Sequence, residues 1–498
     1  MGAVERQANS ALLAEARERG RCGSPQAIHS APPEQEGTAV STPSLLVRST
    51  ARCSTGVQAH TDALLRRMLS PMVGLDTQIG HTLRTRGESR FMMAGAEMTG
   101  IHVLRNQPRP PRGHYHIGGA GVHVDEALIR SLGETVERYA QFASEIHLMR
   151  GLHWATYDQL HRDGEPVLAP EAVTVYSHRQ YALQGFPFKP FDVSVPLHWI
   201  RAASLIDDRT CWVPAQLVLV GYNVRTGDKE PRIGLAVTTG GAAHVTETLA
   251  KRNGLFEQIQ IDAAITHWYG GRHVVRVDLD TRTRALANLI DRLWTRSGDR
   301  SLSFYWLVDR EFPVFSMACV ITNAGGVPAS VVGLGADLGL ETAMYKALLE
   351  ALGIIQLAKV TLMNLAVAKP GSSPADIDPD GIFDLDTNVG YYALPGHGAT
   401  IQEKFDSRSR QPAGELPDDG PSDPADAVAL LLDRFRALGL DLYGFDLTTP
   451  DVRTLGFQAH RVWSPQLLSL CMPSAPPAAH PRFGTFGGFR YVGPHPYP

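Results

Sequence analysis

The sequence predicts a mixed fold of helices and strands, in the α/β or α+β class, and three observations support this prediction. Several short segments are rich in β-branched and aromatic residues, as strands are. Several longer segments place apolar residues at helical spacing. The third observation is an internal repeat, in which a glycine-rich stretch is followed by a long amphipathic segment with a glutamate deep inside it.

The composition excludes several classes of protein. The chain has 498 residues, with 47 Lys and Arg against 51 Asp and Glu, so its formal net charge is −4. Hydrophobic residues make up 43% and charged residues 20%, as in ordinary globular proteins, which excludes a disordered or collagen-like chain. Nucleic-acid binding is not expected either, because neutralising phosphates needs a strong excess of Lys and Arg. We expect a globular protein with a sizeable core.

The cysteines and the apolar segments favour a cytosolic location. The five cysteines are far apart and form no CxxC pair, so neither a zinc cage nor a disulfide framework is expected. The first twenty residues are rich in Glu, Arg and Ala and contain no apolar signal segment. The longest apolar stretch, residues 351–368, is interrupted by Gln356, Lys359 and Asn364, which indicates a buried helix and not a membrane span.

Along the chain, two segments have the composition of loose polypeptide. Residues 1–57 are polar and rich in small residues, so we expect a disordered N-terminal arm, with one domain following over 58–498. The second segment, at about 370–426, is rich in Pro, Gly and Asp, and we expect a loose insertion there. Between and after them the pattern predicts a helix within 60–75, strands within 213–224, 273–280, 303–310 and 314–323, and a helix followed by a strand within 425–448.

The internal repeat has three units. A glycine is followed by a helical glutamate 16 or 17 residues later, from Gly118 to Glu134, from Gly240 to Glu257 and from Gly333 to Glu350. The period is too irregular for a solenoid. We therefore expect three units, each with a glycine loop and an acidic helix, that converge on one site.

The first acidic helix carries a polar stripe. Ser131, Glu134 and Glu137 follow each other at three-residue steps, with Arg138 four residues after Glu134, so these side chains share one face. Glu257 and Gln260 repeat the spacing in the second unit. Carboxylate and amide oxygens suit Mg²⁺, and an arginine beside them can bind phosphate. The alternative is a solvated helix face with ordinary Glu–Arg pairs.

Common nucleotide motifs are absent from the sequence. The stretch 333–339 lacks the third glycine of GxGxxG, because Leu338 stands in its place. No GxxxxGK[ST] loop occurs, which argues against ordinary P-loop chemistry.

Several motifs together resemble the YcaO family. The segment SLGETVERYA matches its SxxExxER signature, and GGAG before it, VPA at 213–215, TTGGAAH and NGLFEQIQIDAAITHW follow in the family's order. The resemblance runs from about residue 60 to the last five residues, PHPYP. It implies a fold of the YcaO type that binds ATP and Mg²⁺ without a P-loop.

The resemblance also implies site residues. Its motifs assign ATP and Mg²⁺ binding to Ser131, Glu134, Glu137, Arg138, Glu257 and Gln260, and the metal itself to Glu134, Glu137, Glu257 and Gln260. Thr239, Lys346 and Glu350 are further nucleotide candidates, the last two from a helix similar to the family's RALxEA. Three departures, Ala120, Gly353 and Ile261, put some phosphate contacts in doubt.

Family members that end in PxPxP resemble cyclodehydratases, which implies an activity. A Cys, Ser or Thr side chain of a ribosomally made precursor peptide attacks the preceding carbonyl, ATP phosphorylates the resulting oxyanion, and loss of phosphate leaves a thiazoline or oxazoline. Proline fixes φ, so the tail from Pro494 to Pro498 is expected to be stiff and to bring the Pro498 carboxylate into the site as a catalytic proton acceptor.

The resemblance further implies partners. The N-terminal arm is too short and polar for a leader-binding module, so a separate protein related to ThiF or ubiquitin-activating enzymes is expected to deliver the precursor. An azoline dehydrogenase is a further candidate partner, and the chain is expected to form a homodimer. Three alternatives stay open: thioamide formation, macrolactamidine formation and a non-catalytic scaffold subunit.

Overall fold

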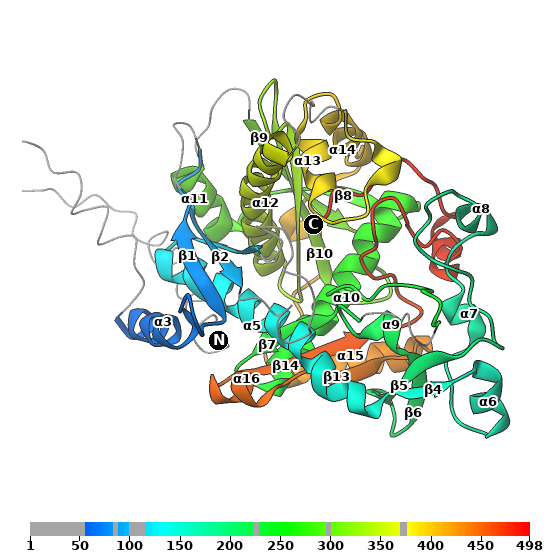
Figure 1. Ribbon diagram of the computed structural model, residues 1–498. Coiled ribbons are helices and arrows are strands. Elements are labelled where there is room, and N and C mark those ends of the chain that lie inside the picture. Colours follow the sequence, from blue (N-terminus) through cyan, green and yellow to red (C-terminus); the bar gives the residue numbers. More distant parts are fainter. Residues whose placement is uncertain (1–54, 83–87, 99–115, 223–228, 295–299, 369–375) are drawn as a thin grey trace, which may run out of the picture.

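The computed structural model describes residues 55–82, 88–98, 116–222, 229–294, 300–368 and 376–498 (Figure 1). Three sheets form its framework. The first has the order β1 (Asp76–His81), β2 (Met92–Met98), β3 (His116–Gly121). The second has the order β11 (Ser330–Asp337), β10 (Phe315–Asn323), β9 (Arg300–Leu307), β8 (Val274–Asp278), β12 (Arg410–Pro412). The third has the order β4 (His153–Ala155), β5 (Leu197–Ser204), β13 (Tyr443–Asp446), β14 (Gln458–Trp463), β7 (Gly241–His244), and β6 (Thr210–Pro214) also pairs with β5.

The mixed fold class is confirmed, and the pairing makes it α+β. Among the strand pairs of the described residues, only β8 and β12 run parallel. The strands predicted within 273–280, 303–310 and 314–323 are β8, β9 and β10. The prediction for 213–224 is largely wrong, because β6 ends at Pro214 and the short helix α9 (Ala215–Val218) follows.

Three long helices hold the sheets together. They are α5 (Val124–Leu148), α10 (Glu247–Tyr269) and α12 (Leu340–Ala368). Helix α5 packs on β2 and β3 of the first sheet and on β7 and β14 of the third. Helix α10 packs on β7 and β14 of the third sheet and on β10 and β11 of the second. Helix α12 packs on β10 and β11 of the second sheet and on β3 of the first. Each helix therefore contacts two sheets. The packing forms a closed ring of contacts from the first sheet through α5 to the third, through α10 to the second, and through α12 back to the first.

The glycine-rich stretches of the repeat are mainly strands, which corrects the expectation of loops. They form β3, β7 and β11, each of which leads into one of the long helices. A Cβ at Gly119 would lie 2.2 Å from the Ala127 oxygen on α5, and one at Gly335 would lie 2.3 Å from the Ala343 oxygen on α12. On α10 the glycine is on the helix, since a Cβ at Gly254 would lie 2.5 Å from the Gly240 oxygen. Glycine is required here because strand and helix backbones touch.

Helix α12 is only partly the buried helix that the sequence predicts. Its first half is buried in the core, but Val360, Met363 and Val367 are exposed. Within the part of the chain that the structure describes, the segment Leu340–Val367 has the length and composition of a helix that could cross a membrane. In its most apolar stretch of 18 residues, 39% is buried inside the protein. Several of the surrounding apolar side chains come from β10 and β11, so its first half belongs to the core of the domain.

Shorter helices cover the outside of the framework. They are α3 (Thr55–Met68), α6 (Tyr157–Arg162), α7 (Pro170–Val173), α8 (His178–Tyr181), α11 (Arg284–Leu293), α13 (Thr387–Ala393), α14 (Gly398–Lys404), α15 (Pro424–Leu438) and α16 (Pro450–Thr454). The helix predicted within 60–75 is α3, which begins at Thr55, and the helix and strand predicted within 425–448 are α15 and β13. The expected disordered arm lies, up to residue 54, outside the described residues.

The insertion expected to be loose is ordered over its described part, residues 376–426. It contains α13, α14 and β12, and Asn388, Tyr392 and Ile401 are at most 2% exposed. The polar composition comes mainly from the turns between these elements, while the apolar residues pack on β11 and α12. The expectation of a loose segment is therefore wrong there, because a few buried side chains are enough to anchor it.

Candidate nucleotide and metal site

A cavity of about 500 Å³ opens where the three long helices converge. Most of the residues that the sequence predicted for the site line it: Glu134, Glu137, Arg138, Glu257, Gln260, Lys346, Glu350 and Pro498. They come from α5, α10, α12 and the C-terminal tail, which are separate segments of the sequence. The three repeat units therefore do meet at one site, as the spacing predicted.

Helix α5 supplies the most elaborate wall of the cavity. Glu134 accepts a hydrogen bond from the Gly118 N–H at 3.2 Å, so the strand of its own unit holds it, and its other oxygen lies 3.5 Å from Arg138. One turn further on, Glu137 accepts a hydrogen bond from Gln141 Nε2 at 3.2 Å. The i, i+4 spacing places all these side chains on one helix face. This face lines a cavity, so the alternative of an ordinary solvated surface does not fit the structure.

Burial, together with the neighbouring carboxylates, raises the pKa of three carboxyl groups at the cavity. Burial, and then the nearby Glu134, raise the pKa of Glu137 to about 8 against the pull of Arg138. Burial raises the pKa of Glu257 well above its usual value, and the charge of Glu137 adds to this effect. Burial and the charge of Glu134 raise the pKa of Glu350 to about 8. Burial is the largest cause of all three shifts, so a cation bound among these groups would favour their ionised forms.

This electrostatic arrangement fits divalent cations. The donor set is carboxylate and amide oxygen, which Mg²⁺ prefers. Among the described residues, no three His, Cys, Asp or Glu side chains already form a closed metal-binding group, so the carboxylates surround an open space and not a preformed cage. Mg²⁺ commonly takes only one or two protein carboxylates together with phosphate oxygens, and an open acidic cavity suits that mode.

Basic and polar residues that the sequence reasoning missed also line the cavity. Arg130 and Asn253 lie one helical turn before Glu134 and Glu257. The same i, i+4 rule that found the glutamates could have found both of them. Lys346, which was predicted, donates to Asp337 Oδ2 at 2.8 Å and lies over the ring of Phe256, 5.4 Å from its centre. The cavity therefore has cationic groups on the walls formed by α5 and α12.

Two predicted residues are not on the cavity wall. Ser131 is fully buried, directly behind Gly119, where its backbone nitrogen would lie 2.5 Å from an added Cβ. Thr239 is 1% exposed and its hydroxyl accepts a hydrogen bond from the Leu470 N–H at 3.1 Å. The structure thus gives Thr239 a role in holding the chain near Leu470. Of the departures from the family pattern, Ala120 and Gly353 do line the cavity.

An arginine behind the cavity was also missed. Arg461, on β14, is 1% exposed, and burial lowers its pKa to about 10 while the charge of Glu257 opposes that shift. Its Nε and Nη1 atoms are buried without a hydrogen-bond partner in the described residues. This buried guanidinium therefore favours the ionised form of Glu257, against the effect of burial. No helical spacing could reveal it, because β14 is remote in sequence from the acidic helices.

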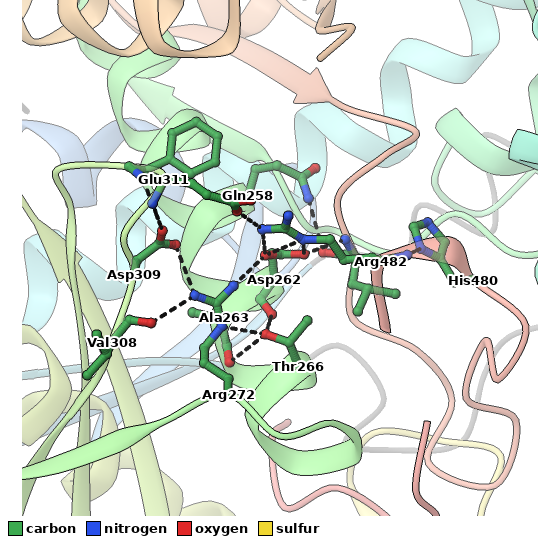
Figure 2. A network of polar contacts seen from close by, with 12 residues as sticks. Gln258, Asp262, Ala263, Thr266, Arg272, Val308, Asp309, Glu311, His480 and Arg482 are labelled. Carbon is green, nitrogen blue, oxygen red and sulfur yellow. Dashed lines mark hydrogen bonds and ion pairs between the residues drawn. The ribbon is translucent and has the colours of Figure 1, made fainter. Parts of the chain in front are cut away.

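A buried ionic network fixes α10 to the C-terminal part of the chain (Figure 2). Asp262 lies between two arginines, 3.0 Å from Arg272 Nη2 and 2.8 Å from Arg482 Nη2. Arg272 continues to Asp309 at 3.2 Å, and Arg482 pairs with Glu311. Asp262 follows Glu257 by five residues and Gln260 by two on the same helix, so the network fixes the position of these two residues relative to the tail that follows Arg482.

The comparisons with known proteins agree with this geometry. The sequence model described as YcaO cyclodehydratase, binding ATP and Mg²⁺, matches residues 118–468. The chain belongs to the YcaO family. ATP and Mg²⁺ are therefore its cofactors. No curated protein sequence matches the chain.

Solved structures share the YcaO fold. A heterocyclase in complex with substrate and cofactor has a TM-score of 0.64 at 19% identity, covering 90% of this chain and 58% of its own. YcaO from Methanopyrus kandleri, bound with AMPPCP and Mg²⁺, has a TM-score of 0.52 at 16% identity, covering 79% of this chain and 86% of its own. The E. coli microcin synthetase McbBCD complex has 0.58 at 13%, covering 86% and 98%. The chain thus spans little more than half the length of the first of these proteins.

Proposed function

We propose that this YcaO protein forms azolines in a ribosomally made peptide. The observation that supports the proposal most strongly is the convergence of three acidic helices and Pro498 on one cavity. The family description adds the cyclodehydratase reaction, and two of the structural neighbours are named as a heterocyclase with its substrate and a microcin synthetase.

The proposed reaction removes one water from the peptide for each ring. The thiol or hydroxyl of a Cys, Ser or Thr gives up its proton to a base and attacks the preceding carbonyl carbon, and the carbonyl oxygen becomes an oxyanion. Magnesium-bound ATP supplies the phosphoryl group that makes this oxygen a good leaving group. The nitrogen loses its proton as phosphate leaves and the C=N bond forms, so ADP, phosphate and the azoline are the products.

The residues of this chain have separate roles in the proposal. Glu134, Glu137, Glu257 and Gln260 would hold the metal, with Glu350 beside them. Arg130, Arg138 and Lys346 would neutralise the triphosphate from the α5 and α12 walls. We propose that Pro498 faces the reacting peptide and that its carboxylate accepts a proton that is released during ring formation.

We also propose the setting in which the enzyme works. A separate leader-binding protein would deliver the precursor, and the complex named for McbBCD is a precedent for assembly with other proteins. We propose a cytosolic homodimer, and the free thiols of Cys211, Cys319 and Cys471 are compatible with a reducing compartment.

The test combines the full-length protein with ATP, Mg²⁺ and the candidate precursor peptide encoded beside its gene. We expect loss of one water per ring, one ADP per ring, and a cysteine that no longer reacts with an alkylating reagent. A gain in mass from exchange of oxygen for sulfur would instead establish thioamide formation. Loss of water with every Cys, Ser and Thr side chain unmodified would indicate an amidine. Failure to bind Mg²⁺ with AMPPCP would leave only the scaffold role.

A further inference from the structure

The last residues of the chain are buried although they have almost no backbone donors. His495 and Tyr497 are at most 1% exposed, and Pro494 and Pro496 are buried beside them. Proline has no N–H, so this tail can be held through its backbone almost only by its carbonyl oxygens. Whatever seats the tail must therefore offer hydrogen-bond donors to these oxygens.

Three such donors come from two helices. Trp268 of α10 donates from Nε1 to the Gly493 oxygen at 3.1 Å, and Tyr392 of α13 donates from its hydroxyl to the Pro494 oxygen at 2.6 Å. Asn388, also on α13, donates from Nδ2 to the oxygens of both His495, at 2.8 Å, and Tyr497, at 2.7 Å. Each carbonyl from Gly493 to His495, and that of Tyr497, thus has a donor.

Asn388 is suited to this double contact. Carbonyls two residues apart point the same way on an extended chain, and the two hydrogens of one amide nitrogen can bond both. Asn388 is fully buried, and its Oδ1 has no hydrogen-bond partner among the described residues. Among the described residues, the side-chain amide of Asn388 therefore makes its hydrogen bonds to the tail.

Helix α13 is itself fixed against the core. The Cβ of a residue at Gly390 would lie 3.0 Å from the Thr361 methyl group on α12. At the end of the helix, the Ala393 oxygen accepts a hydrogen bond from the Ala329 N–H at 2.7 Å. Helix α12 also carries Lys346 and Glu350 of the cavity wall. Because α13 contacts both α12 and the tail, it holds the tail at a fixed position relative to these two residues.

We propose that Asn388 is a positioning residue, which seats the Pro-His-Pro-Tyr-Pro tail and thereby places Pro498 on the cavity wall. The proposal rests on the proposed function for the role of Pro498 in the reaction. The seating itself is independent of that function and can be measured without turnover.

The experiment uses the full-length protein and hydrogen exchange of the C-terminal peptide that contains the His495 and Tyr497 amides. Asn388→Asp keeps the size of the side chain but turns two donors into acceptors that face two carbonyls. We expect exchange of that peptide to accelerate roughly thirtyfold or more, as two hydrogen bonds are lost. Binding of Mg²⁺ with AMPPCP stays within about twofold of the unmodified protein, and kcat falls at least about tenfold with KM for ATP unchanged.

Matched variants keep the result interpretable. Asn288→Asp makes the same chemical change on α11 and leaves the tail protected. Tyr392→Phe removes only the donor to the Pro494 oxygen, so we expect a smaller increase in exchange. This variant still tests the seating of the tail if Asn388→Asp fails to fold. Unchanged tail exchange in Asn388→Asp would overturn the proposal, and so would faster exchange with unchanged kcat. If the unmodified protein forms no azoline, the proposed function fails, while the exchange data still decide whether Asn388 seats the tail.

Discussion

Glu257 illustrates how a single residue can serve binding at a cost in stability. Burial and the charge of Glu137 raise its pKa, so the ionised form is the costly one in the folded state. Without metal, the contribution of Glu257 to the free energy of unfolding is most favourable below the pKa of an unfolded glutamate, about 4.5. This contribution is lost as the pH rises through the higher pKa of the folded state.

We therefore predict opposite effects of Glu257→Gln on stability and on binding. Glutamine resembles the neutral acid, so the metal-free variant should equal the unmodified protein near pH 5 and exceed its Tm by roughly 2–4 °C near pH 9. Binding of Mg²⁺ with AMPPCP should be abolished. Glu403→Gln, on the exposed side of α14, is the control and should change neither property. Intact nucleotide binding in Glu257→Gln would contradict the assignment.

His495 predicts a pH dependence of the opposite sign. It is fully buried among the rings of Tyr269 and Tyr497, its Nε2 lies 2.6 Å from the Cys471 oxygen, and burial lowers its pKa to about 4. A lowered basic pKa contributes stability that is present above the unfolded value, about 6.5, and is lost as the pH falls towards 4. The shift corresponds to about 3 kcal/mol.

The tail should therefore loosen in acid before the rest of the domain. Hydrogen exchange of the C-terminal peptide, corrected for the intrinsic effect of pH, should show protection that declines between pH 6.5 and 4. Peptides from the centre of β10 serve as the internal reference. Protection that stays constant over this range would exclude His495 as the responsible group.

The residues found from the sequence and those missed differ for a physical reason. Helical spacing identifies which side chains share a face, and it led correctly to Glu134 and Glu137 on one cavity wall. It says nothing of how deep a side chain lies, so Ser131 was grouped with them although it is buried behind a strand. Arg461 stayed invisible because its neighbours come from distant parts of the chain.

At the scale of whole elements, the segments with clear periodicity were predicted and those with special glycines were not. Strands β8, β9 and β10 carry β-branched and aromatic residues and were found. Strands β3, β7 and β11 contain several Gly and Ala residues, which resemble loops in sequence. Only the packing of a helix backbone on the strand reveals why a side chain is excluded there.

The ionic network around Asp262 allows a test of how elements are joined. Asp262→Asn would leave Arg272 and Arg482 buried without their shared carboxylate, and we predict a loss of about 3–5 kcal/mol in the free energy of unfolding. Asp278→Asn removes a partner of Arg410 at the surface and should cost far less, because exposed ion pairs contribute little to stability. Urea unfolding measures both. Equal effects of the two variants would show that the network contributes no more than a surface pair.

At the scale of the molecule, the sequence predicted three converging units but not the ring they form. Each long helix uses a second face to contact the sheet of a neighbouring unit, and these contacts join residues too far apart in sequence for any local pattern to show. The insertion was misjudged for the same reason, since α13 is ordered by α12 and the tail.

The N-terminal arm provides the last prediction. Residues 1–50 have few large apolar side chains, so their deletion should change Tm by no more than about 2 °C. Differential scanning calorimetry of the full-length and shortened chains measures this. If the shortened protein keeps its Tm but no longer binds the precursor or the partner protein, the arm has a docking role.

The contact of glycine with helix backbone limits how the site can change over time. At Gly119 and Gly335 no other side chain fits, so these two positions cannot gain new functional groups by single mutations. Gly118 has open space around it and Ala120 lines the cavity, so β3 can still gain groups beside the fixed glycine. Variation among homologous enzymes should therefore spare Gly119 and Gly335 and occur at their strand neighbours, on the facing helices and in the tail.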